Sequence, residues 1–153
     1  MKANKEARLL TEIGDLYRKM AWLNSIKLAD SFKGYKSSEI HCIEYIGNNA
    51  ECNVTKLAES FYMTRGAISK MTQKLIKKEI IESYQKSDNK KEIYFSLTEK
   101  GTEIYKIHAE LHNEFSERDK AVFDQITDEQ LEIMLNFVKM YSEHLDKEIQ
   151  KEG

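Results

Sequence analysis

The sequence predicts a mainly α-helical fold with a small β-wing, in which a winged helix-turn-helix core carries long helices at both ends of the chain. Three features predict it. Apolar residues recur at helical spacing in two short stretches between residues 53 and 77, with a turn between them. Two runs rich in β-branched and aromatic residues follow at 81–86 and 92–98. Long apolar repeats lie at both chain ends, so residues 37–98 are expected to form the winged domain and residues 1–36 and 99–153 a helical region.

Composition limits the class of protein. A chain of 153 residues suits one compact domain with additional helices, and its charged fraction of 33% is ordinary for a soluble, helix-rich protein. The absence of proline permits long uninterrupted helices. No apolar run of about 20 residues and no signal-peptide pattern is present, so we expect a cytoplasmic protein without a membrane partner. Two cysteines are too few for a secreted disulfide framework.

The two short helices of the core have capping residues where they are needed. Asn53 precedes the first helix and Thr64 the second, and side-chain oxygens of these types accept hydrogen bonds from free backbone N–H groups. The apolar faces that follow are expected to be buried, and they consist of Leu57, Ala58 and Phe61 in the first helix and Ile68, Met71 and Leu75 in the second.

The opposite face of the second helix is polar, small and basic, as a helix lying in the major groove of DNA requires. We expect DNA contacts from Thr64, Arg65, Gly66, Ser69, Lys70, Gln73 and Lys74. Within this set, we expect Arg65, Ser69 and Gln73 to contact base or sugar edges. We expect the lysines to contact mainly the phosphate groups.

The polar segment 87–91 is expected to form the tip of the wing, with DNA contacts from Asn89, Lys90 and Lys91. The formal net charge of the whole chain is −2, which by itself argues against DNA binding. Between Asn53 and Gly101, however, the sequence has ten basic residues and six acidic ones, so positive charge is concentrated in the winged segment. Such sorting is expected where one face meets phosphate; the alternative is that the lysines only solvate the surface.

The N-terminal helix is expected from about residue 5 to 32, with Gly34 as its break. Ser37 or Ser38 would then cap the next helix, and the run 47–49 would end it.

After the wing, Thr98 would cap a long helix at 99–122. A capping box at 127–130 opens the final helix, whose apolar stripe is close to a heptad repeat. Such a stripe is longer than the winged domain can cover, so we expect both chain ends to build a homodimer that binds a pseudo-palindromic operator in double-stranded DNA. An isolated monomer is the alternative.

Several motifs in the core and just after it match a known family. They are Leu57-Ala58-Glu59, Thr64-Arg65-Gly66-Ala67-Ile68-Ser69-Lys70, Asp88-Asn89-Lys90-Lys91 and Leu97-Thr98-Glu99-Lys100-Gly101. With these motifs the chain resembles the MarR-type transcriptional regulators. The resemblance implies a DNA-binding regulator, a repressor rather than an activator, whose DNA affinity changes when a small molecule or metal ion binds between the dimerisation helices and the winged domain.

Two positions depart from the family pattern. The turn between the core helices usually has glycine where this chain has Tyr62, and a left-handed backbone there would cost tyrosine roughly 1–2 kcal/mol. The wing usually carries Asp-x-Arg, whereas this chain has Asp88-Asn89-Lys90. Because lysine lacks the planar fork of arginine, we expect weaker or less shape-selective minor-groove reading.

Three histidines fall in the region where relatives bind effectors: His41, His108 and His112. The last two are four residues apart on one helix face, so both rings can reach one metal ion. The chain lacks the hydrolytic zinc motif, because Ala109 occupies the place of its glutamate. The three positions resemble those of the zinc-sensing branch of the family, which implies zinc as a candidate effector. That branch adds a glutamate from the first helix, and none is in register here.

Other sensing chemistries stay open. Cys42 is a candidate redox thiol, although its helix position equally suits a small buried side chain. A pocket for a small aromatic acid, common in related proteins, leaves no signature in the sequence. No cofactor is required by any of these interpretations.

Two further function classes are alternatives. The winged fold also serves as a protein–protein interaction module, but the basic, small-residue face of the second core helix lacks the apolar anchor that protein interfaces prefer. An enzyme is not expected, because no nucleophile–base pair, phosphate-binding loop or carboxylate pair stands out.

Overall fold

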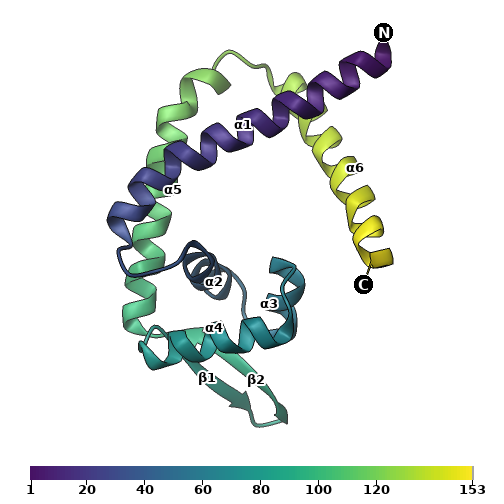
Figure 1. Cartoon of the computed structure of the whole chain (residues 1–153). Coiled ribbons are helices and arrows are strands. Elements are labelled where there is room, and N and C mark those ends of the chain that lie inside the picture. Colours follow the sequence, from purple (N-terminus) through teal and green to yellow (C-terminus); the bar gives the residue numbers. More distant parts are fainter. Residues whose placement is uncertain (153) are drawn as a thin grey trace. The chain divides into compact units, whose positions relative to one another are not determined.

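Six helices and one two-stranded hairpin make up the chain in a computed structural model that describes residues 1–152 (Figure 1). The elements in order are α1 (Lys2–Ser31), α2 (Ser37–Asn48), α3 (Val54–Phe61), α4 (Arg65–Lys77), β1 (Ile81–Lys86), β2 (Asn89–Leu97), α5 (Glu99–Phe123) and α6 (Asp128–Glu152). The predicted mainly α-helical fold with a β-wing is confirmed. The chain divides into two compact units at Asn113, and each is described by itself.

The core of the first unit is a helix-turn-helix. The Asn53 side chain accepts a hydrogen bond from the Lys56 N–H at 2.9 Å, and the Thr64 hydroxyl accepts one from the Ala67 N–H at 3.1 Å. Both predicted caps are therefore confirmed. Leu57 of α3 and Ile68 of α4 are fully buried, so the two helices pack through the predicted apolar faces.

The hairpin that follows α4 is antiparallel, with Ile81 opposite Leu97 and Tyr84 opposite Tyr94. Its second strand begins at Asn89, three residues earlier than predicted, so the tip of the wing is shorter than the segment 87–91. The pairing reaches Lys86 opposite Asn89 after an irregularity in the register between Tyr84 and Lys86. Beside it, the Gln85 side-chain amide donates to the Lys90 carbonyl at 2.8 Å.

The base of the hairpin is joined to the segment before α3. The Phe95 N–H donates to the Cys52 carbonyl at 2.9 Å, and the two residues form an isolated antiparallel bridge. Both side chains are buried. Figure 1 shows the hairpin projecting from the α4 side of the core.

The start of α2 differs from the prediction. Neither Ser37 nor Ser38 caps the helix; instead the Glu39 carboxylate reaches back and accepts from the Lys36 N–H at 3.0 Å. The sequence did not indicate this cap, because the burial of Glu39 depends on two distant lysines, Lys74 of α4 and Lys78 directly after that helix.

The start of α5 packs closely against the turn before β1. The Thr98 hydroxyl accepts from the Gly101 N–H at 3.1 Å, which confirms Thr98 as the cap. A Cβ atom on Gly101 would lie 2.1 Å from the Ile80 carbonyl oxygen, so this contact requires glycine. The glycine of the Leu-Thr-Glu-Lys-Gly motif thus has a packing role.

The terminal helices are long, and neither α1 nor α6 contains a buried residue in the single chain. The capping box before α6 is confirmed, since Thr127 and Gln130 exchange backbone-to-side-chain hydrogen bonds of 3.0 and 3.1 Å. Gly34 after α1 has a φ of +90°, in agreement with its predicted role as a break. Among the described residues, no helix has the length and apolar character needed to cross a membrane.

Candidate nucleic-acid interface and histidine cavity

The polar face of α4 points outward, as predicted. Ile68, Met71, Thr72 and Leu75 form its buried face. On the opposite side the exposed residues are Thr64, Arg65, Gly66, Lys70, Gln73 and Lys74, and Ser69 is half-buried. This arrangement leaves donors and positive charge free to meet a duplex along one face of the helix.

The wing residues lie on β2 rather than in a loop. Lys90 and Lys91 are exposed, and Asn89 is half-buried. The Asn89 side chain accepts a hydrogen bond from the Lys91 N–H at 3.2 Å, so its amide oxygen stabilises the turn. The two lysines are therefore the wing side chains best placed to meet DNA.

A buried acid behind α4 was missed by sequence reasoning. Glu39 of α2 is 2% exposed, and its carboxylate lies 3.4 Å from the Lys74 ammonium and 3.6 Å from that of Lys78. Burial raises the pKa of Glu39, but the Lys36 N–H and the charges of Lys78 and Lys74 outweigh it and hold the pKa below its usual range. Lys74 is thus paired within the chain, whereas Lys70 is an exposed cation.

A cavity of about 490 Å³ lies among α1, α2 and the first half of α5. Much of its wall is apolar, with Met20 and Leu28 from α1 and Ile40 from α2. The three histidines singled out in the sequence, His41, His108 and His112, also line it. An apolar cavity with a few convergent polar groups is the usual form of a ligand site.

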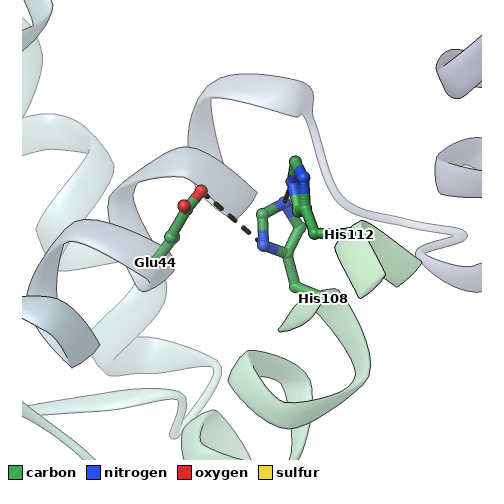
Figure 2. A group of neighbouring side chains, drawn as sticks. All are labelled: Glu44, His108 and His112. Carbon is green, nitrogen blue, oxygen red and sulfur yellow. Dashed lines mark hydrogen bonds and ion pairs between the residues drawn. The ribbon is translucent and has the colours of Figure 1, made fainter. Parts of the chain in front are cut away.

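His108 and His112 come together on one face of α5, with their Nε2 atoms 3.2 Å apart (Figure 2). On the other side of His108, the Nδ1 atom lies 3.6 Å from a Glu44 carboxylate oxygen. Ligand nitrogens about 2.0–2.1 Å from a tetrahedral zinc ion stand roughly 3.3 Å apart, so the Nε2 pair fits one ion. A carboxylate on the other ring nitrogen is the usual device that fixes the tautomer and orientation of such a histidine.

The protonation state of His108 also suits metal binding. The residue is 3% exposed, and this burial lowers its pKa, with Glu44 opposing the shift and the neighbouring histidines adding to it. The neutral imidazole, which is the form that binds metals, is therefore favoured.

The predicted set of three histidines is modified by the structure. His41 is exposed on α2, and its ring centroid lies 6.5 Å from that of His108. Within the described residues, the group whose ligand atoms all lie within 4.8 Å of one another contains Glu44, His108 and His112 but not His41. The sequence did contain a signal for Glu44, because it follows His41 by three residues and so shares its helix face.

The cysteines do not have the environment of a thiol sensor. Cys42 and Cys52 are both completely buried. Burial raises the pKa of Cys42 to about 12 and that of Cys52 to about 11. A redox-sensing thiol needs exposure and a lowered pKa, so the interpretation of Cys42 as a redox site is corrected here.

Similarity to known proteins identifies the family. The family model described as "MarR family" matches residues 36–93. The HTH-type transcriptional regulator PchR of Bacillus subtilis (strain 168) is 30% identical over 150 residues, and the match covers 89% of each chain. The chain belongs to the MarR family. It is accordingly a DNA-binding transcriptional regulator, in a family of regulators rather than enzymes.

Solved structures show the same fold. The structure of Streptococcus pneumoniae FabT in complex with DNA has a TM-score of 0.77 and 20% identity, and the match covers 92% of this chain and 96% of FabT. Staphylococcus aureus MarR in complex with salicylate and kanamycin has a TM-score of 0.74 and 18% identity, covering 94% and 93% of the two chains. The winged helix-turn-helix of this MarR-family protein thus has the architecture of its structural relatives.

Proposed function

We propose that this MarR-family protein is a homodimeric repressor that binds a pseudo-palindromic operator through α4 and the wing, and that a ligand in the histidine cavity changes its DNA affinity. The outward polar face of α4 carries the proposal. Arg65, Ser69 and Gln73 would contact base or sugar edges, while Lys70 and the wing lysines would contact phosphate. The structure of FabT in complex with DNA supports the proposal that this fold binds DNA.

Selection from a genomic pool tests operator binding. Fragments retained by the protein would be sequenced, and the recovered site would be used in fluorescence anisotropy with wild type, Arg65→Ala and Gln73→Ala. Both variants should bind the site more weakly and discriminate less among altered sites. The exposed α1 residue Lys5, substituted by Gln, serves as the control. Equal affinity and selectivity for all four proteins would disprove the assignment.

Homodimerisation through residues 1–36 and 99–153 is supported by the terminal helices. α1 exposes Leu9, Ile13 and Leu16, and α6 exposes Leu135 and Val138. Neither helix buries a residue in the single chain, so both apolar stripes need a partner. Sedimentation should give a dimer, and the double variant Leu135→Glu, Val138→Glu should shift it toward monomer. A monomeric wild type would exclude the dimer.

Two ligand classes fit the cavity. A metal ion such as zinc would be held by the Nε2 atoms of His108 and His112, with Glu44 orienting His108. A small aromatic acid would instead use the apolar wall, and S. aureus MarR is described in complex with salicylate.

Operator affinity separates the two ligand classes. It would be measured after chelation, with excess zinc, and with salicylate. The double variant His108→Gln, His112→Gln should lose a zinc response, while His144→Gln on α6 should retain it. If none of the additions changes affinity, regulation through the cavity is wrong. The direction of any transcriptional effect is read from an operator-linked reporter, in which deletion of a repressor raises expression.

A further inference from the structure

Tyr62 has a backbone conformation that does not suit a tyrosine. It follows α3 with φ 53° and ψ 42°, in the left-handed region, where an aromatic residue is destabilised relative to glycine or asparagine. The turn into α4 uses this conformation, because the Tyr62 and Met63 N–H groups end α3 on the Ala58 carbonyl. A glycine would make the same turn without the conformational cost.

Contacts within the chain do not account for the tyrosine. Glu51 and Glu79 also have positive φ. Of these, Glu51 forms an ion pair with Lys86, and the Glu79 carbonyl accepts a 2.7 Å hydrogen bond from the Thr98 hydroxyl. The Tyr62 side chain, by contrast, is 69% exposed, and among residues 1–152 its phenol has no hydrogen-bond partner. Strained residues that the fold does not explain are concentrated at functional sites.

The position of Tyr62 in the chain points to DNA binding as the function that explains the strained conformation. It stands two residues before the cap Thr64 and three before Arg65, at the end of α4 that begins the predicted DNA face. Recognition helices of this type contact bases with their N-terminal residues, so the turn ahead of them passes close to the phosphate strand that borders the groove. Tyrosine hydroxyls are among the side-chain groups that bind phosphate oxygens.

We propose that Tyr62 is a DNA-affinity residue whose hydroxyl donates to a phosphate oxygen and whose ring lies against the sugar–phosphate strand beside the groove that α4 enters. The protein thereby exchanges stability of the turn for affinity. This inference rests on the proposed insertion of α4 in the major groove.

Substitution by glycine tests the exchange, because it should move two measurements in opposite directions. Tyr62→Gly relieves the left-handed strain and should raise the melting temperature by roughly 3 °C. The same variant should bind the selected duplex about tenfold more weakly, as expected for loss of a hydrogen bond to a charged group. A purely structural tyrosine would instead lower the melting temperature when removed, and that result would overturn the proposal. Unchanged DNA affinity would also overturn it.

Two further variants isolate the cause. Tyr62→Phe keeps the strain and the ring, so its melting temperature should match wild type while its affinity falls; wild-type affinity in this variant would exclude the hydroxyl contact. Glu79→Gly relieves comparable strain at φ 61° beyond the other end of α4 and should raise the melting temperature without weakening DNA binding. If the glycine at 79 weakens binding as strongly as the glycine at 62, local flexibility explains the loss and the proposal fails.

The failure of this inference can be told apart from failure of the operator-binding proposal. Arg65→Ala and Lys70→Gln report on whether α4 meets DNA at all. If they weaken binding and Tyr62→Gly does not, only the role of Tyr62 is wrong. If none of the three affects binding, α4 is not the reading helix and both proposals fall together.

Discussion

A carboxylate oxygen of Glu39 lies 3.4 Å from the ammonium nitrogen of Lys74, so an acid buried on α2 pairs with one of the basic side chains of α4, the helix that we propose to read DNA. The other carboxylate oxygen lies 3.6 Å from Lys78, which also donates to the Gly34 carbonyl at 3.2 Å and sits over the Tyr35 ring. The C-terminal end of α4 and Lys78 directly after it are thereby connected to the start of α2 and to the segment before it, and Tyr35 of that segment lines the cavity.

The buried acid should make stability depend on pH. Because the pKa of Glu39 is lower in the folded protein than its usual value of 4.5, its contribution is present above about pH 4.5 and is lost as pH falls through the folded pKa. Glu39→Gln should lower the free energy of unfolding at pH 7 by about 1–3 kcal/mol, allowing for the partial exposure of both lysines. Urea unfolding at pH 7 and pH 4 should show a smaller pH effect in the variant.

The control for this measurement is Glu12→Gln, which removes an exposed i, i+4 pair with Arg8. It should change the free energy of unfolding by no more than about 0.5 kcal/mol. An equal pH effect in wild type and Glu39→Gln would show that another group is responsible.

Lys70 and Lys74 should differ in their contribution to the salt dependence of DNA binding. Lys70→Gln removes an exposed cation and should reduce the slope of log affinity against log salt by about one. Lys74→Gln should reduce it by less, because Glu39 already neutralises much of that charge. Anisotropy titrations over a range of salt concentrations measure both slopes. Equal reductions would mean that the Glu39–Lys74 pair opens when DNA binds.

Alanine at position 101 should destabilise the winged core. Its Cβ would lie 2.1 Å from the Ile80 carbonyl oxygen, a backbone atom that already accepts from the Thr98 N–H. Gly101→Ala should therefore reduce the free energy of unfolding by about 2–3 kcal/mol, as overpacked sites do. Gly14→Ala in α1 meets only the end of the Arg18 side chain at 3.5 Å and should be neutral or stabilising by up to about 1 kcal/mol. Denaturant unfolding compares them, and similar stabilities would contradict the packing role.

The thiols should be unreactive in the native protein. Burial raises the pKa of Cys42 to about 12 and of Cys52 to about 11, so almost no thiolate exists at neutral pH. Iodoacetamide at pH 7.5 should label neither residue unless denaturant is added, as mass spectrometry would show. Rapid labelling of the folded protein, or DNA binding that responds reversibly to mild peroxide, would restore a redox role.

Features that depend on nearby residues could be predicted from the sequence. The Asn53 and Thr64 caps each involve a bond to the third residue along, and the buried face of α4 follows from helical spacing. The cap of α2 also joins residues three apart, but lysine is not a usual capping residue, and the burial of Glu39 relies on lysines 35 and more residues away in sequence. Likewise, His108 and His112 share a helix, but only the folded chain brings Glu44 to them. The resemblance raises a left-handed backbone at Tyr62 as one way to build the turn, and the structure has that conformation with an exposed side chain.

The hydrogen bond from Phe95 to Cys52 has a mechanical consequence for operator recognition. It joins the wing to the entrance of α3 through the main chain, so substitutions other than proline at position 95 leave its donor and acceptor in place. Because both side chains are also buried, this contact favours movement of the hairpin together with the helix pair. We expect contacts in the minor groove and contacts in the major groove to form and break together, as a single cooperative event.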